Sequence, residues 1–347
     1  MDSSINNSAW LEWMGQLMGG VPRRTYAATL PLNRFYCLLD ELPVHLVPRP
    51  GAESLRCHEG EETALFMSPA CTFTMGRILP PDLSYLEPLV SGFALQGTVA
   101  WVRDAASAGV WPFLLGTTFE TAANSLNTGE MAARIPCDIR SRLLQAGILT
   151  SEKREARLIR ERQSRIELSA SLFQKKGYAA LAGLIHPFQI AALRRYYRHL
   201  IRTGAISLGD SQSPRRYVAY NEPVARFFHQ QITDTLSAVA GEPLKPSYVY
   251  IASYLSGAEL KRHTDREQCE FSVTLCLDFS PEPVRETPWP IQLDTSAGQV
   301  TVYQALGDGL AYRGTQLPHY RDVLRDGQTS TSIFFHYVRA NFSGPLT

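Results

Sequence analysis

The chain has 347 residues, which favours two domains at a typical ~100–200 residues per domain. Hydrophobic residues make up 44% and charged residues 19%, a composition that excludes a disordered protein. The formal net charge of +1 excludes a strong overall field for attracting nucleic acid or an anionic membrane, so we expect neither partner.

The sequence lacks the patterns of a secretory signal and of a membrane-spanning helix. Residues 1–10 lack the pattern of a secretory signal. The longest weakly charged stretch, 88–102, is shorter than the ~20 residues of a membrane-spanning helix. We therefore predict a cytoplasmic protein. None of its six cysteines forms a CxxC pair, which argues against a zinc knuckle or a thioredoxin-type motif, and in the cytoplasm we expect reduced thiols.

The first third of the chain has a mixed pattern, with prolines near residues 43–50 and glycine-broken apolar segments between residues 91 and 116. Residues 137–146 are predicted to form a helix that ends at Gly147. Ser151 begins a long charged helix, because opposite charges recur at three- and four-residue spacing through Arg165. We interpret it as the link between an N-terminal accessory or substrate-recognition domain, 1–165, and a second domain, 166–347.

The second half changes from a helical to a strand period. Helices are predicted over 186–203 and 222–239, the latter ended by Gly241. Strands are predicted over 248–254, 271–279, 300–304 and 330–338. In the second strand, one face is predicted to carry Phe271, Val273, Leu275, Leu277 and Phe279. Helices followed by strands indicate a β-barrel or sandwich backed by helices.

The triplet His263-Thr264-Asp265 is the clearest candidate for chemistry. Residues i and i+2 of a strand project to the same side, so one imidazole and one carboxylate can hold one ion. A third ligand from another strand would complete a 2-His-1-carboxylate facial triad, which suits non-haem iron(II). The triplet alone is unspecific, since a chain with 8 histidines and 33 acidic residues contains about 0.8 such triplets by chance.

The residues around this triplet form an ordered pattern between turns and predicted strands. In chain order they are Tyr254, Gly257, His263, Asp265, Gly307, Asp308, His319 and Gly327. Over roughly residues 180–340, this pattern resembles the double-stranded β-helix family of iron(II)/2-oxoglutarate-dependent oxygenases. The prolyl-hydroxylase-like branch has the closest pattern.

The resemblance implies an α+β protein, with a C-terminal double-stranded β-helix (jelly-roll) barrel backed by helices and a mixed or mainly helical N-terminal domain. His263, Asp265 and His319 would be the catalytic metal ligands for Fe(II). The cosubstrates would be 2-oxoglutarate and O2, with ascorbate as an in vitro reductant. The dioxygenase would hydroxylate an unactivated C–H bond of a peptide, amino-acid-like or specialised-metabolite substrate and release succinate and CO2. Asp265 favours hydroxylation, because halogenating relatives leave the carboxylate position empty.

One position departs from the family pattern. Relatives bind the distal carboxylate of 2-oxoglutarate with Arg or Lys about ten residues after the second histidine, where this chain has Thr329, Ser330 and Thr331. Arg321 is the preferred substitute, because it lies two residues after His319 and would point to the same side of a strand. The alternatives are Arg313, Arg325 and Arg266. Tyr254 and Thr331 are further candidates for cosubstrate binding.

Two other functions stay open at this point. A non-catalytic barrel-fold binding module is supported by the missing arginine and opposed by the intact triad. A cupin-type metalloenzyme that does not use 2-oxoglutarate is the other alternative. The sequence does not identify the substrate or the oligomeric state.

Overall fold

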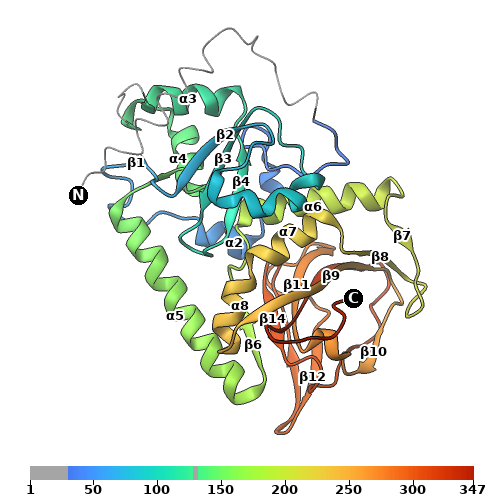
Figure 1. Cartoon of the computed structure of the whole chain (residues 1–347). Coiled ribbons are helices and arrows are strands. Elements are labelled where there is room, and N and C mark those ends of the chain that lie inside the picture. The colour runs from blue at the N-terminus through green and yellow to red at the C-terminus, as the bar shows by residue number, and fades with distance from the viewer. Residues whose placement is uncertain (1–29, 128–131) are drawn as a thin grey trace.

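The computed structural model describes residues 30–127 and 132–347 (Figure 1). It confirms the predicted α+β class. The α-helices of these residues are α2 (Arg49–Ser54), α3 (Thr117–Asn127), α4 (Cys137–Gln145), α5 (Glu152–Lys176), α6 (Pro187–Arg202), α7 (Pro223–Gln231) and α8 (Thr233–Ala240). Their 3-10 helices are η2 (Val44–Leu46), η3 (Pro81–Gly92), η4 (Ala132–Arg134) and η5 (Glu267–Cys269).

The strands divide into an N-terminal and a C-terminal group. The first group is β1 (Phe66–Met67), β2 (Cys71–Met75), β3 (Thr98–Arg103), β4 (Val110–Leu114) and β5 (Leu149–Thr150). The second begins with β6 (Tyr178–Leu181), β7 (Ser207–Leu208), β8 (Arg216–Tyr220), β9 (Leu244–Tyr254), β10 (Leu260–His263) and β11 (Phe271–Ser280). It continues with β12 (Ile291–Thr295), β13 (Gly298–Val302), β14 (Gly309–Tyr312), β15 (His319–Arg321) and β16 (Thr329–Arg339).

The predicted charged helix is α5, and it continues beyond Arg165, where the charge pattern ends, to Lys176. The Ser151 side chain accepts a hydrogen bond from the backbone N–H of Arg154, which caps its start. Gly177 ends it in the left-handed conformation, with φ +76°. The helix runs without a break across residue 165, and Figure 1 shows it along the outside of the molecule beside α8 and β6. The division at residue 165 stays a prediction.

Two of the other predicted helices differ in outcome. The helix at 186–203 is confirmed as α6, whose apolar side is buried. The segment predicted as one helix, 222–239, is instead two helices, α7 and α8, which meet at Ile232. The Thr233 hydroxyl donates to the carbonyl oxygen of His229 at 3.0 Å, a side-chain bond that bends helices.

The C-terminal strands form two separate antiparallel sheets. The larger has the order β6-β14-β11-β16-β9-β8-β7, and the smaller has the order β10-β15-β12-β13. Along the chain from β9 to β16, the strands pass back and forth between the two sheets. This connectivity brings β10 and β15, which lie far apart in sequence, side by side.

A bulge in β11 changes which side its last residues face. The pairing with β16 shifts between Cys276 and Asp278. Leu275 and Leu277 therefore pack with the helices, whereas Phe279 joins Cys276 in a second cluster between the sheets. The prediction that Phe279 shares the face of Leu275 is wrong, because the extra residue reverses the alternation.

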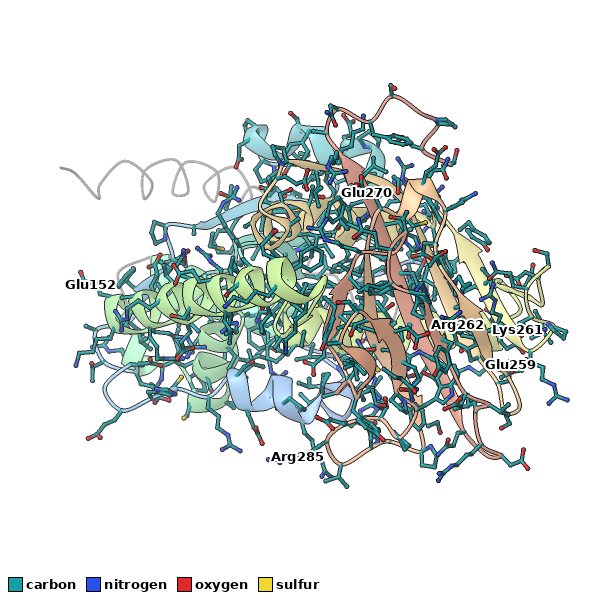
Figure 2. All side chains as sticks on the ribbon, turned by 90° about the horizontal axis from the view of Figure 1, so that it is seen from below. Glu152, Glu259, Lys261, Arg262, Glu270 and Arg285 are labelled. Atoms are coloured by element: carbon teal, nitrogen blue, oxygen red, sulfur yellow. The ribbon has the colours of Figure 1, made fainter. Side chains whose placement is uncertain are left out.

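One large apolar cluster connects the N-terminal strands, the helices and the helix-facing side of β11 and β16. Trp111 of β4, for example, stacks on Phe228 of α7, with ring centroids 5.4 Å apart. The edge of the smaller sheet is solvent-facing instead, and Figure 2 shows Glu259, Lys261 and Arg262 there. The residues of interest for function therefore lie between a packed helical layer and an accessible sheet edge.

Candidate metal centre

Strand pairing brings the two predicted histidines together. His263 at the end of β10 is the direct register partner of His319 at the start of β15. Directly opposed side chains of an antiparallel pair lie on the same side of the sheet. Their ring centroids are 4.4 Å apart. The His319 side chain is buried, whereas that of His263 is 36% exposed, so the pair is accessible from the side of His263.

Asp265 completes this group. Its Oδ1 atom lies 3.6 Å from Nε2 of His263 and 3.6 Å from Nε2 of His319. Its backbone N–H donates to the carbonyl oxygen of Gly314 at 2.9 Å, which fixes the chain beyond β10. A Cβ atom on Gly314 would come within 2.3 Å of the Asp265 carboxylate and 2.4 Å of the Cys269 carbonyl, so only glycine fits there.

The backbone determines which nitrogen each imidazole presents. Nδ1 of His263 lies 2.7 Å from the carbonyl oxygen of Lys261, and Nδ1 of His319 lies 3.0 Å from that of Leu317. A carbonyl oxygen only accepts, so each Nδ1 carries the proton and donates. Each Nε2 therefore directs a lone pair toward Asp265, as metal-binding histidines require.

Burial and neighbouring charges shift the pKa of each residue of this group. Burial lowers the pKa of His319, which favours its neutral form. Burial alone would raise the pKa of Asp265, but contacts with His263 and His319 lower it to about 2. The Asp265 carboxylate raises the pKa of His263. Two imidazoles and one carboxylate that converge in this way match the donor set of a facial iron(II) site.

Two further residues hold the other oxygen of Asp265. The Ser272 hydroxyl donates to Oδ2 of Asp265 at 2.8 Å, and Nδ1 of His336 lies 2.9 Å from the same hydroxyl. Because Ser272 has one proton to give, His336 donates to it through Nδ1. Nε2 of His336 is buried and has no hydrogen-bond partner among residues 30–127 and 132–347. No motif in the sequence identified Ser272 as a residue that positions Asp265.

Arg321 lies two residues beyond His319, and its guanidinium is buried between the sheets. It donates to the Trp289 carbonyl and, at 3.1 Å, to Oε1 of Gln304. Burial lowers its pKa, and no carboxylate of the described chain forms an ion pair with it. A buried cation without an acid favours an anionic ligand. Nε2 of Gln304 in turn donates to the carbonyl oxygens of Thr274 and Asp308, at 2.8 and 3.1 Å.

Tyrosines occupy the same interior. Tyr254 is fully buried against the Trp289 ring, and its hydroxyl accepts a hydrogen bond from Arg216 at 3.2 Å. The Tyr312 hydroxyl lies 3.4 Å from Nε2 of His319. Tyr254 was predicted to be near the cosubstrate, whereas Tyr312 was not among the predicted site residues.

The structure does not bring the other candidates to the centre. Arg313 packs over the rings of Phe173 and Phe271 on the helix-facing side. Thr331 lies two residues before Ile333, which packs with the helices, and three before Phe334, which faces the other sheet. Strand alternation therefore turns Thr331 toward the helices.

The hydroxyl of Thr331 donates to Ser253 at 2.9 Å and not to any residue of the centre. Arg325 is exposed, and Arg266 is an exposed side chain over the Tyr248 ring.

A cysteine lies beside the centre without the character of a ligand. Cys269, Asp265 and His336 form a second group of possible ligand atoms. Burial raises the pKa of Cys269 to about 12, and its sulfur lies 3.0 Å from the Tyr248 hydroxyl. Metals bind the thiolate, so the group of His263, Asp265 and His319 is the better site.

Comparisons with known proteins give matches among solved structures only. No protein-family model and no curated protein matches the chain. The non-heme alpha ketoglutarate dependent epimerase SnoN from nogalamycin biosynthesis is 14% identical, with a TM-score of 0.43 over 51% of this chain and 84% of its own.

A Pseudomonas putida prolyl-4-hydroxylase is 16% identical, with a TM-score of 0.42 over 51% of this chain and 100% of its own. HygX from Streptomyces hygroscopicus, solved with nickel, 2-oxoglutarate and hygromycin B, is 12% identical. Its TM-score is 0.41 over 51% of this chain and 88% of its own.

Within the described residues, no helix is both long enough and apolar enough to cross a membrane.

Proposed function

We propose that this chain is an iron(II)- and 2-oxoglutarate-dependent oxygenase that hydroxylates a peptide, amino-acid-like or specialised-metabolite substrate. The observation that carries the proposal is the convergence of Nε2 of His263, Nε2 of His319 and Oδ1 of Asp265. The alternation of β9 to β16 between two sheets supports a double-stranded β-helix, in which β10 and β15 would carry the ligands.

The residues fit an iron(II) ion and its cosubstrate. His263, Asp265 and His319 would hold the metal and leave positions open for other ligands. When bound, the iron supplies the activation of O2 that is coupled to decarboxylation of 2-oxoglutarate. The chain's own residues orient these groups: Lys261 and Leu317 fix the imidazoles, and Ser272 fixes the carboxylate.

Arg321 would bind the distal carboxylate of 2-oxoglutarate. Its guanidinium has five N–H donors, and two of them are used by Trp289 and Gln304. The remaining donors can form charge-assisted hydrogen bonds with a carboxylate. The non-catalytic alternative was supported by the lack of a cation at the usual position, and Arg321 offers one from β15.

The test is succinate formation by the purified chain with iron(II), ascorbate, O2 and 2-oxoglutarate. We expect 2-oxoglutarate to be consumed slowly even without substrate, and this turnover to be lost in His319→Ala. A cupin-type enzyme would bind the metal without binding 2-oxoglutarate, and a binding module would bind neither. Failure of the unmodified chain to bind 2-oxoglutarate would overturn the proposal. So would undiminished turnover by a His319→Ala protein that circular dichroism shows to be folded.

A further inference from the structure

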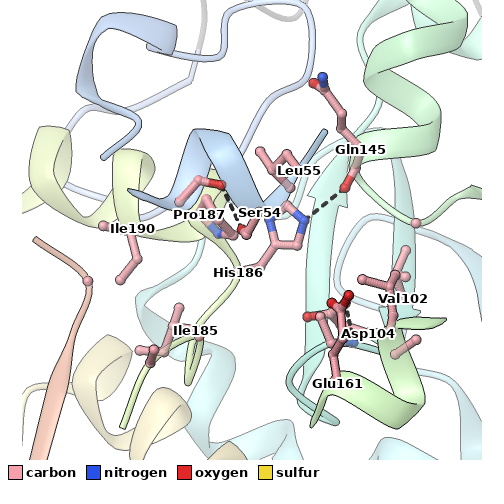
Figure 3. A pocket seen from close by; sticks show the side chains of 18 of the residues that line it. Ser54, Leu55, Val102, Asp104, Gln145, Glu161, Ile185, His186, Pro187 and Ile190 are labelled. Carbon is pink, nitrogen blue, oxygen red and sulfur yellow. Dashed lines mark hydrogen bonds between the residues drawn. The ribbon is translucent and has the colours of Figure 1, made fainter. Parts of the chain in front are cut away.

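A cavity lies away from the metal centre, between the N-terminal elements, α5 and α6. It has a volume of about 180 Å³. Its walls are largely apolar, and Figure 3 shows Leu55, Val102, Ile185 and Ile190 around it. It is large enough for a small molecule and too small for a peptide segment.

Most polar side chains that line this cavity already have partners. Arg154 pairs with buried Glu61, at 3.4 Å, and Glu161 pairs with Arg157, at 3.0 Å. His186 uses both ring nitrogens, because Nε2 donates to the Gln145 carbonyl and Nδ1 accepts from a backbone N–H (Figure 3). These groups have little left to offer a ligand.

The same is true of two further charged residues in the wall. Arg165 donates to the Ala106 carbonyl at 2.8 Å, and the charges of Glu161 and Asp104 lie near it. Both carboxylate oxygens of Asp104 accept hydrogen bonds, from the N–H of Ala106 and the hydroxyl of Ser107. Arg103 pairs with Asp82 at 3.8 Å, so each cation among the described residues of the wall already has a partner.

Asp308, at the end of the cavity nearest β14, is different. Oδ2 accepts one hydrogen bond, from the N–H of Ala305 at 3.1 Å. Within residues 30–127 and 132–347, Oδ1 has no hydrogen-bond donor and the carboxylate forms no ion pair. Burial raises the pKa of Asp308 to about 6, so the group is still mainly ionised at neutral pH. Asp308 is half-buried in the wall of the cavity, so its free oxygen can accept a hydrogen bond from a ligand there.

We propose that this cavity binds a small ammonium compound with an apolar body, whose N–H groups donate to the Asp308 carboxylate. The apolar walls would bury the body, and the carboxylate would supply a charged contact that fixes its orientation. The proposal does not rest on the iron chemistry, because none of the residues that line the cavity is a candidate metal ligand.

The experiment compares cyclohexylammonium with cyclohexanol, which has nearly the same shape but no charge, by calorimetric titration of the full chain. We expect the ammonium compound to bind at least about tenfold more tightly, as a charge-assisted hydrogen bond provides. In Asp308→Asn, which can still accept from Ala305, the two affinities should come within about twofold of each other. Asp326→Asn, an exposed aspartate, is the matched control and should behave as the unmodified chain.

Equal affinities of the two compounds for the unmodified chain would overturn the proposal without any variant. So would undiminished ammonium binding by Asp308→Asn. Because the first comparison uses only the unmodified chain, it is decisive even if the variant does not fold.

Discussion

Two aspartates of the C-terminal half are equally buried and have opposite surroundings. The side chains of Asp265 and Asp278 are both 11% exposed. Asp278, on the helix-facing side of β11, receives Arg194 at 2.9 Å and Arg198 at 2.5 Å, both from α6. Asp265, on the interior side, meets two imidazoles at 3.6 Å and one hydroxyl.

The difference shows how to tell a binding centre from a structural contact in this molecule. Around Asp278, strong donors use the carboxylate fully, and the result is a fixed link between α6 and the sheet. Around Asp265, the two imidazole nitrogens are too far away for strong hydrogen bonds, and their lone pairs face the carboxylate. Asp265 and its two imidazoles are as well placed as Asp278 but lack such partners, which indicates that a ligand binds between them.

Replacing each aspartate separately tests this contrast most strongly. Asp265→Ala should lower iron(II) affinity by more than about 100-fold, because loss of a ligand should exceed the 10–100-fold typical of outer residues. Anaerobic titration with iron(II) measures this affinity. Retained affinity in a folded Asp265→Ala protein would remove Asp265 from the ligand set.

Asp278→Asn should act on stability and not on metal affinity. It removes one of the two carboxylates that pair with the fully buried guanidinium of Arg194 and leaves Glu282, at 2.8 Å, as the other. The free energy of unfolding should fall by about 2 kcal/mol in urea denaturation. A larger effect on iron(II) affinity than on unfolding would contradict the comparison.

The same contrast holds for two buried cations. Arg194 pairs with two carboxylates, whereas Arg321 pairs with none among the described residues. Arg321→Gln should weaken 2-oxoglutarate binding by about 10–100-fold, while the chain without ligand stays at least as stable, because a buried unpaired charge is removed. Arg325→Gln changes an exposed residue and is the control. If Arg325→Gln weakens binding and Arg321→Gln does not, the carboxylate site is elsewhere.

A buried imidazole outside the centre provides a pH test. His229 is buried under β16, its Nε2 donates to the His336 carbonyl at 2.9 Å, and burial lowers its pKa to about 3. A histidine whose pKa is lower in the folded state binds a proton more readily when the protein is unfolded. The folded state therefore has its full stability above the unfolded pKa of about 6.5 and loses stability as the pH falls below that value. From pH 6.5 to 4.5 the free energy of unfolding should fall by about 2 kcal/mol through this group. His229→Gln should remove that part of the pH dependence, and an unchanged slope would assign it to other groups.

The smallest expected effect concerns Ser272. Ser272→Ala removes the donor to Oδ2 of Asp265 and should weaken iron(II) binding by about tenfold. Ser253→Ala, on the helix-facing side of β9, is the matched control and should leave iron(II) binding unchanged. An effect of equal size in both variants would indicate general destabilisation.

The sequence predicted those parts of the molecule that depend on short periods. The i, i+2 spacing placed His263 with Asp265 and His319 with Arg321 on the interior side, and helical periodicity identified α6. It missed features that depend on one local irregularity, namely the β11 bulge that redirects Phe279 and the separation of α7 from α8 at Ile232.

Features formed by distant residues were also beyond the sequence. Strand parity turns Thr331 away from the centre, but that parity is fixed only once β16 is paired. Ser272 and Gly314 carry no motif, because their roles come from the approach of other strands to Asp265. The cavity combines residues from Pro48 to Asp308 and has no local signal at all.

The Gln304 side chain connects the two regions of interest. Oε1 accepts from Arg321, and Nε2 donates to the backbone carbonyl of Asp308. An ammonium compound bound to Asp308 and a carboxylate bound to Arg321 would therefore each contact a residue that is hydrogen-bonded to the Gln304 amide. Thermodynamic linkage requires that if one ligand changes the affinity for the other, the second changes the first by the same factor. A small amine could in this way set how readily the centre takes up its cosubstrate.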